Sequence, residues 1–199
     1  MGSLGIADDS LVIAYDDTGG LTAGRLAVML RMLGHDAAVL AGGLTAWKGP
    51  IETGPGRAPT AAVFSAKPWP GDRLADANDA RQVAADGGAV LDARSYQRFI
   101  GEIAQIDKRA GHIPGARCAY WADVLDSDAM PRSVDELRRH FRELGVEDGT
   151  DAVAYCGSGV SACMNVLAME HAGMGIPRLY VASWSGWSAD PNREAALGD

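Results

Sequence analysis

One cysteine stands where the chain is expected to stabilise a negatively charged sulfur. Cys156 follows an apolar stretch, residues 151–155, and opens the segment CGSGVSA, residues 156–162. The apolar stretch predicts a strand, and a helical pattern follows over residues 162–171. A small-residue loop between a strand and a helix N-terminus points successive backbone N–H groups into one anion-binding concavity. The thiolate of Cys156 is therefore expected to be held there and to act as a nucleophile.

Composition and charge restrict the classes of partner. The 199 residues suffice for one or two domains, and 47% hydrophobic with 22% charged residues is ordinary for a globular protein. The net charge is -8 and no basic stripe is present, so a nucleic-acid partner is not expected. No apolar run reaches the length that spans a bilayer, and the first five residues lack the pattern of a secretory signal. We therefore expect no membrane partner.

The three cysteines, Cys118, Cys156 and Cys163, show no pattern of pairing or metal ligation. Their odd number and the lack of CxxC spacing argue against a disulfide framework and a structural zinc site. Reduced thiols in a cytoplasmic protein are expected, with Cys163 in the core. Asp16 and Asp17 are adjacent turn carboxylates without a third ligand, which are usually solvated. The sequence therefore predicts no metal and no other cofactor.

The layout around the cysteine occurs twice. Tyr15 and Tyr155 each end a predicted strand, 140 residues apart, and Trp47 and Trp187 end Gly/Ser-rich segments at the same spacing. Two landmarks at one offset indicate a duplicated unit. The first copy carries an aspartate, Asp16, in place of the cysteine, so only the second copy is expected to do chemistry.

Alternating strand and helix patterns predict an α/β fold with a mainly parallel central sheet flanked by helices. The Pro- and Gly-rich residues 50–73 lack periodicity and are typical of a linker. They separate a partial unit, residues 1–49, from a domain, residues 74–199. We expect strands over residues 10–15, 37–40, 89–93, 151–155 and 177–181, and helices over residues 21–33, 76–86, 133–144 and 162–171.

Several motifs together resemble two-domain rhodanese-type sulfurtransferases, in their mercaptopyruvate sulfurtransferase-like form. The motifs are the loop at 156–162, DAR at 92–94 followed by Arg98-Phe99, GHIPGA at 111–116, and Ser183-Trp184 with Trp187. The resemblance covers most of the chain from residue 75, and residues 10–49 resemble the back half of the family's inactive first domain. It implies a rhodanese-like domain preceded by a partial copy, the first domain being truncated at its N-terminal half. Uncovered sheet edges and apolar surface would favour self-association through that incomplete domain.

The resemblance also implies an activity. Cys156 would take a sulfane sulfur from thiosulfate or 3-mercaptopyruvate as a persulfide and pass it to cyanide or a thiol. Arg98 matches the family arginine that binds the anionic end of the donor. Ser158 matches a loop serine that is assigned a proton-relay role in the mercaptopyruvate enzymes. The expected substrate-binding residues are Arg98, Gly157, Ser158, Gly159, Val160, Ser161 and Ala162.

Departures from the family pattern leave the donor open. Asp107 occupies the position where a second donor-binding arginine is common, and Lys108 or Arg109 are the neighbouring candidates to replace it. A neutral Gly-Ser-Gly loop favours a 2-oxo acid over doubly charged thiosulfate, whereas the missing arginine weakens that preference. The Asp and His that the family implies as partners of the loop serine belong to the missing front half.

Two other function classes compete. A cysteine phosphatase needs an arginine six residues after the cysteine, where this chain has Ala162. A degenerate rhodanese-like fragment acting as a non-catalytic binding or regulatory module is favoured by the truncation and disfavoured by the intact loop. Structural roles are expected for the Asp92–Arg94 ion pair, for His112 in its turn and for the two tryptophans, Trp184 and Trp187, beside the loop.

Overall fold

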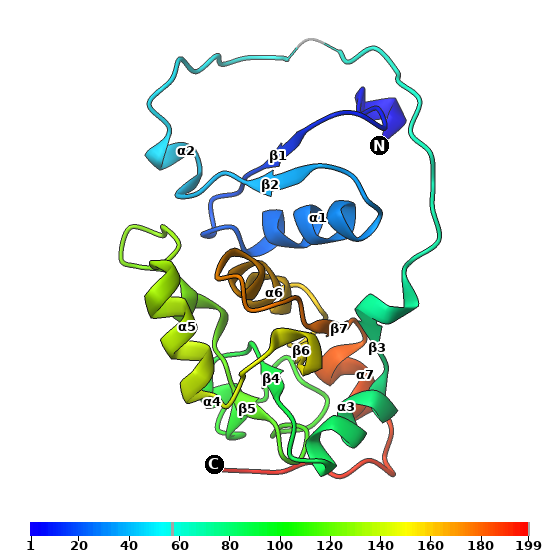
Figure 1. Cartoon of the computed structure of the whole chain (residues 1–199), viewed down its shortest axis with the longest axis vertical. Helices are drawn as coiled ribbons and strands as arrows, with labels where there is room; N and C mark the ends of the chain where they lie inside the picture. Colours follow the sequence, from blue (N-terminus) through cyan, green and yellow to red (C-terminus); the bar gives the residue numbers. More distant parts are fainter. Residues whose placement is uncertain (57, 199) are drawn as a thin grey trace.

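The computed structural model describes residues 1–56 and 58–198 and contains two parallel sheets (Figure 1). The larger sheet has five strands in the order β3-β7-β6-β4-β5, every neighbouring pair being parallel. The smaller sheet pairs β1 with β2, also in parallel. The predicted α/β fold with a mainly parallel sheet is thereby confirmed. Arg57 of the predicted linker and Asp199 of the predicted C-terminal domain lie outside the described residues.

The elements are short, and the predicted strands and helices occur among them in the predicted order. The smaller sheet and its helices comprise η1 (Gly2–Leu4), β1 (Val12–Ala14), α1 (Leu21–Met32), β2 (Ala37–Val39) and α2 (Gly43–Ala46). The strands of the larger sheet are β3 (Leu74–Ala75), β4 (Val90–Asp92), β5 (Arg117–Cys118), β6 (Val153–Tyr155) and β7 (Arg178–Tyr180). The helices around it are η2 (Gly71–Arg73), α3 (Ala77–Ala85), α4 (Tyr96–Phe99), η3 (Trp121–Val124), α5 (Val134–Glu143), η4 (Gly149–Asp151), α6 (Ala162–His171) and α7 (Ser183–Ala189).

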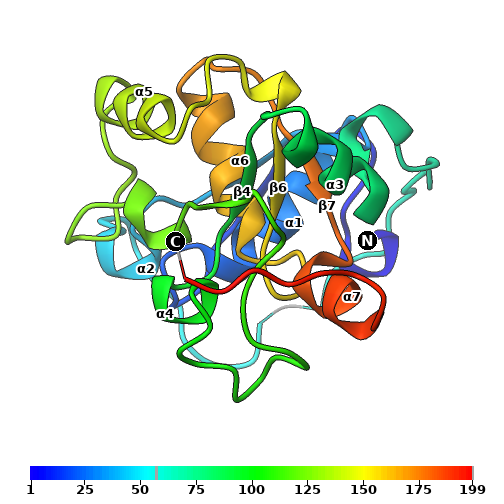
Figure 2. The same cartoon turned by 90° about the horizontal axis from the view of Figure 1, so that it is seen from below.

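Helices cover both faces of the larger sheet. Figure 2 shows β4, β6 and β7 with α5 on one side and α3 and α7 on the other. Successive side chains of a strand point to opposite faces, so Val90 packs with Phe99 and Trp184 while Leu91 packs with Phe141. Both faces of the central strands are therefore buried, as expected for a parallel sheet between helices.

Side-chain caps fix where two of these helices begin. Ser133 and Glu136 form the capping box predicted for α5, each side chain accepting a hydrogen bond from the backbone N–H of the other residue. Asp76 and Asp79 do the same at α3. Carboxylates near a helix N-terminus also interact favourably with the helix dipole.

The smaller unit rests on the larger one through two helices, because α1 packs against α6 (Figure 1). A glycine permits the close approach, since a Cβ on Gly24 would lie 2.9 Å from Sδ of Met164. Arg31 of α1 pairs with Glu170 of α6 at 2.6 Å. The helix that follows the cysteine loop is therefore braced by the N-terminal part of the chain.

The predicted linker has no helix or strand before η2 in its described part. Figure 1 shows the described part of the linker on the outside of the smaller sheet and continuing down to β3. Its middle is nevertheless packed, because Ser65 donates two hydrogen bonds to the Asp8 carboxylate and Phe64 stacks on His35. The division into domains stays a prediction. In the described part of the chain, every helix falls short of what crossing a bilayer requires.

Candidate active site

Cys156 sits at the carboxyl end of the central strand β6, where the chain leaves the sheet. Its N–H donates to Oγ of Ser183 at 3.2 Å, and its carbonyl accepts from the N–H of Trp184 at 2.9 Å. The Ser183 hydroxyl in turn donates to the carbonyl of Tyr180 at 2.8 Å. The first turn of α7 thus clamps the cysteine backbone to the end of β7, which fixes the start of the loop.

The sulfur receives a backbone hydrogen bond from within its own loop. The N–H of Gly159 donates to Sγ of Cys156 at 3.1 Å, and the cysteine is only 2% exposed. Gly159 has φ +75°, and a Cβ there would lie 2.7 Å from the carbonyl oxygen of Val181. Glycine is therefore required at this position by both backbone conformation and space. One loop amide therefore faces the sulfur, and the contribution of the other loop amides to the predicted cradle stays a prediction.

A pocket of about 240 Å³ opens onto this sulfur. Of the eight predicted site residues, six line it, Gly159 contacts the sulfur, and Ala162 is buried as the first residue of α6. The predicted residues that line it are Arg98, Cys156, Gly157, Ser158, Val160 and Ser161. The other lining residues, Leu21, Ile106, Asp107 and Ser185, were not among the predicted site residues. Leu21 comes from α1, so the smaller unit forms part of the wall.

The predicted donor-binding residue, Arg98, is already bound to a carboxylate. Its Nε and Nη2 donate to the two oxygens of Asp107 at 2.9 and 2.6 Å. Asp107 is almost fully buried, whereas the Arg98 side chain keeps 21% exposure at the pocket. Gly157 admits this guanidinium, because a Cβ there would lie 3.0 Å from Nη2 of Arg98. The charge that an anionic donor meets is therefore reduced by the bidentate pair.

A second arginine lies behind the pair in a buried network. Arg94 donates to both oxygens of Asp92 and to Asp107, and its guanidinium stacks 4.9 Å from the ring of Trp184. The structural ion pair predicted for Asp92 and Arg94 is confirmed, and Trp184 is fully buried beside it. Asp107 thus links the buried network to Arg98 at the surface of the pocket.

Neither neighbour of Asp107 replaces a second arginine. Among the described residues, Lys108 and Arg109 do not line the pocket that holds Cys156. Arg109 instead donates to the carbonyl of Arg193 at 2.8 Å, and its own carbonyl accepts from the indole of Trp184. The suggestion that Lys108 or Arg109 supplies the missing cation is therefore not supported by their placement.

The other two cysteines are poor nucleophiles. Burial, reinforced by the neighbouring Cys156 sulfur, raises the pKa of Cys163 to about 12, and Arg25 opposes this only in part. Burial together with Asp92 and Asp123 raises the pKa of Cys118 to about 11. Cys163 is fully buried, as predicted for a core residue. Both thiols are therefore neutral near pH 7.

His112 stabilises the turn in which it lies and does not contact the Cys156 sulfur. Its Nδ1 lies 2.9 Å from the carbonyl of Phe99, and its ring stacks on the Phe99 ring with centroids 3.7 Å apart. The histidine is buried and does not line the pocket that holds Cys156. This placement agrees with the predicted structural role.

The turn predicted to be a first copy of the loop holds an anion of its own. Asp16, the predicted counterpart of the cysteine, is expected to be solvated, but its carboxylate occupies a cradle of backbone amides. The donors are the N–H groups of Thr18, Gly20, Thr22 and Ala23 and the hydroxyl of Thr22, all at 2.7 to 2.9 Å. Burial opposes ionisation of Asp16, yet these hydrogen bonds outweigh it and lower its pKa well below the ordinary range. This strand–loop–helix turn at Asp16 therefore holds a negative group.

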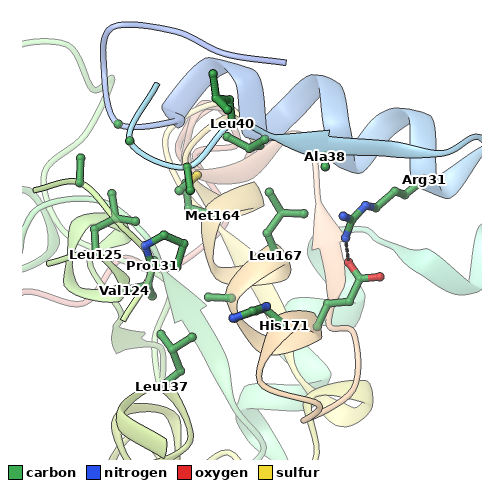
Figure 3. Close-up of a pocket in the computed structure, with 17 residues that line it drawn as sticks. Arg31, Ala38, Leu40, Val124, Leu125, Pro131, Leu137, Met164, Leu167 and His171 are labelled. Atoms are coloured by element: carbon green, nitrogen blue, oxygen red, sulfur yellow. Dashed lines mark hydrogen bonds and ion pairs between the residues drawn. The ribbon is translucent and has the colours of Figure 1, made fainter. Parts of the chain in front are cut away.

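A larger and mainly apolar cavity lies elsewhere. A space of about 470 Å³ separates β2 from α5 and α6 (Figure 3). Apolar side chains such as Leu40, Leu125, Met164 and Leu167 point into it, and among the described lining residues there is no cysteine. We place the candidate site at the smaller pocket, because it contains the ionisable sulfur and the arginine. Within the described residues, no cluster of three His, Cys, Asp or Glu side chains is arranged to hold a metal ion.

Fold and site together define a class. The features are a five-stranded parallel sheet between helices, a cysteine at the end of its central strand, and a loop amide directed at the sulfur. The chain belongs to the rhodanese-like family, since the rhodanese-like domain matches residues 73–190.

Named relatives extend over nearly the whole chain. A probable 3-mercaptopyruvate sulfurtransferase from Pseudomonas aeruginosa is 43% identical over 205 residues, covering 98% of this chain and 70% of that protein. A putative thiosulfate sulfurtransferase of Mycobacterium tuberculosis is 36% identical and covers 98% of this chain and 69% of its own length. The solved 3-mercaptopyruvate sulfurtransferase from Leishmania major superposes with a TM-score of 0.80 at 34% identity, over 92% of this chain. This chain spans about half of that last protein, 52%.

Proposed function

We propose that the chain is a rhodanese-type sulfurtransferase that moves a sulfane sulfur from thiosulfate or 3-mercaptopyruvate to cyanide or a thiol. The observation that carries the proposal is the 3.1 Å hydrogen bond from the Gly159 amide to Sγ of Cys156, at the floor of a pocket that Arg98 borders. Relatives at 33 to 43% identity bear the names of 3-mercaptopyruvate or thiosulfate sulfurtransferases. A phosphatase is disfavoured, because residue six after the cysteine is Ala162 and the loop contains no cation.

The chemistry needs two displacements at sulfur. The Cys156 thiolate attacks the outer sulfur of thiosulfate, the S–S bond of the donor breaks, and sulfite leaves with the bonding electron pair. With 3-mercaptopyruvate the C–S bond breaks instead, and the departing pyruvate carbanion takes up a proton at carbon. The acceptor then attacks the outer sulfur of the Cys156 persulfide and restores the thiolate, so the cycle is ping-pong. The Gly159 amide supports the negative Sγ of the resting thiolate and of the thiolate that the acceptor step restores.

The donor is bound through its anionic end in this proposal. Arg98 offers the exposed part of its guanidinium to a carboxylate or sulfonate, while Asp107 holds the other part. Asp107 lowers the net positive charge of the donor site around Arg98. The lower charge favours a singly charged 2-oxo acid over doubly charged thiosulfate as the donor. The amides of the loop from Gly157 to Ala162 complete the proposed donor site, and Ser158 lies at its solvent-exposed rim.

Steady-state transfer tests the function. The purified chain is given thiosulfate or 3-mercaptopyruvate with cyanide, and thiocyanate is measured over time. Cys156→Ser should abolish transfer, whereas Cys118→Ser should leave it unchanged, because Cys118 lies outside the pocket. Absence of thiocyanate from the wild-type chain with either donor would favour a non-catalytic binding module.

We further infer that residues 1–49 correspond to the back half of a second rhodanese-like unit. Two features support this: β1, α1 and β2 repeat the strand–loop–helix–strand order of β6, α6 and β7, and Asp16 occupies the cradle that corresponds to the cysteine loop. Residues 50–73 are then the connection and residues 74–199 the catalytic domain. Chain cleavage within residues 50–56, followed by a test of whether the two fragments stay associated, would examine this division.

The smaller sheet also supports the proposal that the chain associates with a second copy of itself. Ile13 of β1 is exposed, as are Leu11 and Tyr15, which flank this strand at alternate positions. One face of the smaller sheet therefore carries apolar side chains. Burial of this face between two copies of the chain would remove that surface from water. Sedimentation analysis should show that the wild type forms a dimer and that Ile13→Lys, which places a charge on this face, dissociates more readily. A wild type that stays monomeric at all concentrations would contradict self-association.

Three free cysteines favour a reducing, cytoplasmic setting for the protein.

A further inference from the structure

A cation from the smaller unit reaches the cysteine loop. Arg25 lies on α1, and its Nη1 donates to the carbonyl oxygen of Ser158 at 3.0 Å across 133 positions of sequence. The contact depends on the close packing of α1 on α6, which Gly24 permits. Val28, one helical turn beyond Arg25, belongs to the same buried cluster as Cys156. The arginine is therefore held beside the loop by a packed interface.

The bonded carbonyl belongs to the peptide group that faces the sulfur. The carbonyl of Ser158 and the N–H of Gly159 are two ends of one planar trans peptide and point in opposite directions. Arg25 binds the outer end at 3.0 Å, and Sγ of Cys156 accepts from the inner end at 3.1 Å. Rotation of this peptide would break both hydrogen bonds. Arg25 thus fixes the direction in which the sulfur-binding amide points.

The same contact strengthens the amide as a donor. A cation on a carbonyl oxygen draws electron density toward the oxygen, so the N–H of that peptide becomes more positive. The other guanidinium groups near the site are committed to carboxylates, Arg94 to Asp92 and Arg98 to Asp107. In the described part of the chain, Arg25 has no carboxylate within ion-pair distance. Its charge is therefore not cancelled by an adjacent acid.

We propose that Arg25 is a positioning residue for the sulfur-transfer reaction, acting through the Ser158–Gly159 peptide on the Cys156 thiolate. The inference rests on the proposed function and extends it. The larger domain supplies the nucleophilic sulfur, and the smaller unit supplies the arginine that orients the amide bound to it. The inference assigns the N-terminal residues a part in the chemistry beyond covering α6.

The test compares three variants by the rate at which iodoacetamide alkylates Cys156 at fixed pH. Arg25→Met removes the charge and the donor but keeps much of the side-chain volume. Arg25→Lys keeps the charge and one donor. Arg31→Met is the matched control, because Arg31 lies on the same helix and bridges to Glu170 of α6 at 2.6 Å without touching the loop (Figure 3). Thermal melts of all variants record the loss of interface stability.

The expected result separates positioning from stability. Arg25→Met should slow alkylation roughly five- to tenfold, a loss in line with weakening one hydrogen bond to a charged acceptor. Arg25→Lys should recover most of the rate. Arg31→Met should lower the melting temperature as much as Arg25→Met or more, with an unchanged alkylation rate.

Two results would overturn the inference. One is an alkylation rate in Arg25→Met equal to that of the wild type, and the other is an equal slowing in Arg31→Met. Sulfur uptake from the donors is measured separately on the wild type. A wild type that is alkylated normally but takes up no sulfur would refute the proposed function, while the alkylation series still decides the role of Arg25.

Discussion

Gly159→Ala is expected to disable the cysteine loop while leaving the sulfur in place. An L-residue at φ +75° costs about 1–2 kcal/mol, and the new Cβ would lie 2.7 Å from the Val181 carbonyl oxygen and 3.1 Å from its Cα. Both neighbours are backbone atoms, so the loop must shift. The amide then moves away from Sγ of Cys156, which it now meets at 3.1 Å.

The size of the effect follows from the hydrogen bond that is lost. A hydrogen bond to a charged group contributes about 1.5–3 kcal/mol. At about 1.4 kcal/mol for each factor of ten, the rate at which the Cys156 sulfur reacts should fall roughly 10- to 100-fold. The assay is the second-order rate of iodoacetamide alkylation of Cys156 at pH 7, followed by peptide mass spectrometry. Sulfur transfer from either donor should fall by a similar factor.

Gly87→Ala is the matched control. Gly87 has φ +78°, close to that of Gly159, but nothing lies within 4 Å of the position that its new Cβ would take. The substitution should cost about 1–2 kcal/mol of unfolding free energy and leave the alkylation rate at its wild-type value. Equal alkylation rates in Gly159→Ala and the wild type would refute the reasoning, as would an equal decrease in Gly87→Ala.

Three further predictions follow from single groups. Asp107→Asn should release Arg98 and raise the thiosulfate-to-mercaptopyruvate ratio of kcat/KM roughly tenfold, and an unchanged ratio would contradict the specificity argument. In Cys156→Ser, alkylation at pH 8 should be nearly absent, because burial raises the pKa of Cys118 to about 11 and of Cys163 to about 12; rapid labelling of either would contradict this. Asp16 has a lowered pKa, so its stabilising effect is present above about pH 4 and is lost as the pH falls further. Asp16→Asn should therefore cost about 1–2 kcal/mol in urea unfolding at pH 7, with the difference from wild type narrowing below pH 4.

Periodicity and turn chemistry were enough to predict the main elements. The helix after the cysteine was expected over residues 162–171 and is found as Ala162–His171, because a long apolar pattern begins directly after small loop residues. The α5 capping box is encoded locally by Ser133 and Glu136. β3 and β5 were missed, because two-residue strands carry no periodicity and form only by pairing with strands distant in sequence.

The site could be predicted where its residues lie close together in the sequence. Cys156 and the Gly159 amide lie within one loop, so residue type and spacing indicate their relation. The sequence shows Asp107 as a departure from the family pattern, but its ion pair with Arg98 depends on the fold of an irregular loop. Arg25 gave no signal at all, because its contact with Ser158 spans 133 positions and arises from the packing of two helices. Contacts of this kind are set by tertiary structure alone.

The central claim is that a sulfur atom from the donor becomes bonded to Cys156. The direct measurement is intact-protein and peptide mass spectrometry after incubation with excess thiosulfate or 3-mercaptopyruvate, before and after addition of cyanide. The account predicts a gain of one sulfur on the peptide that contains Cys156, and its complete loss once cyanide is added. No gain with either donor, or the same gain in Cys156→Ser, would contradict it.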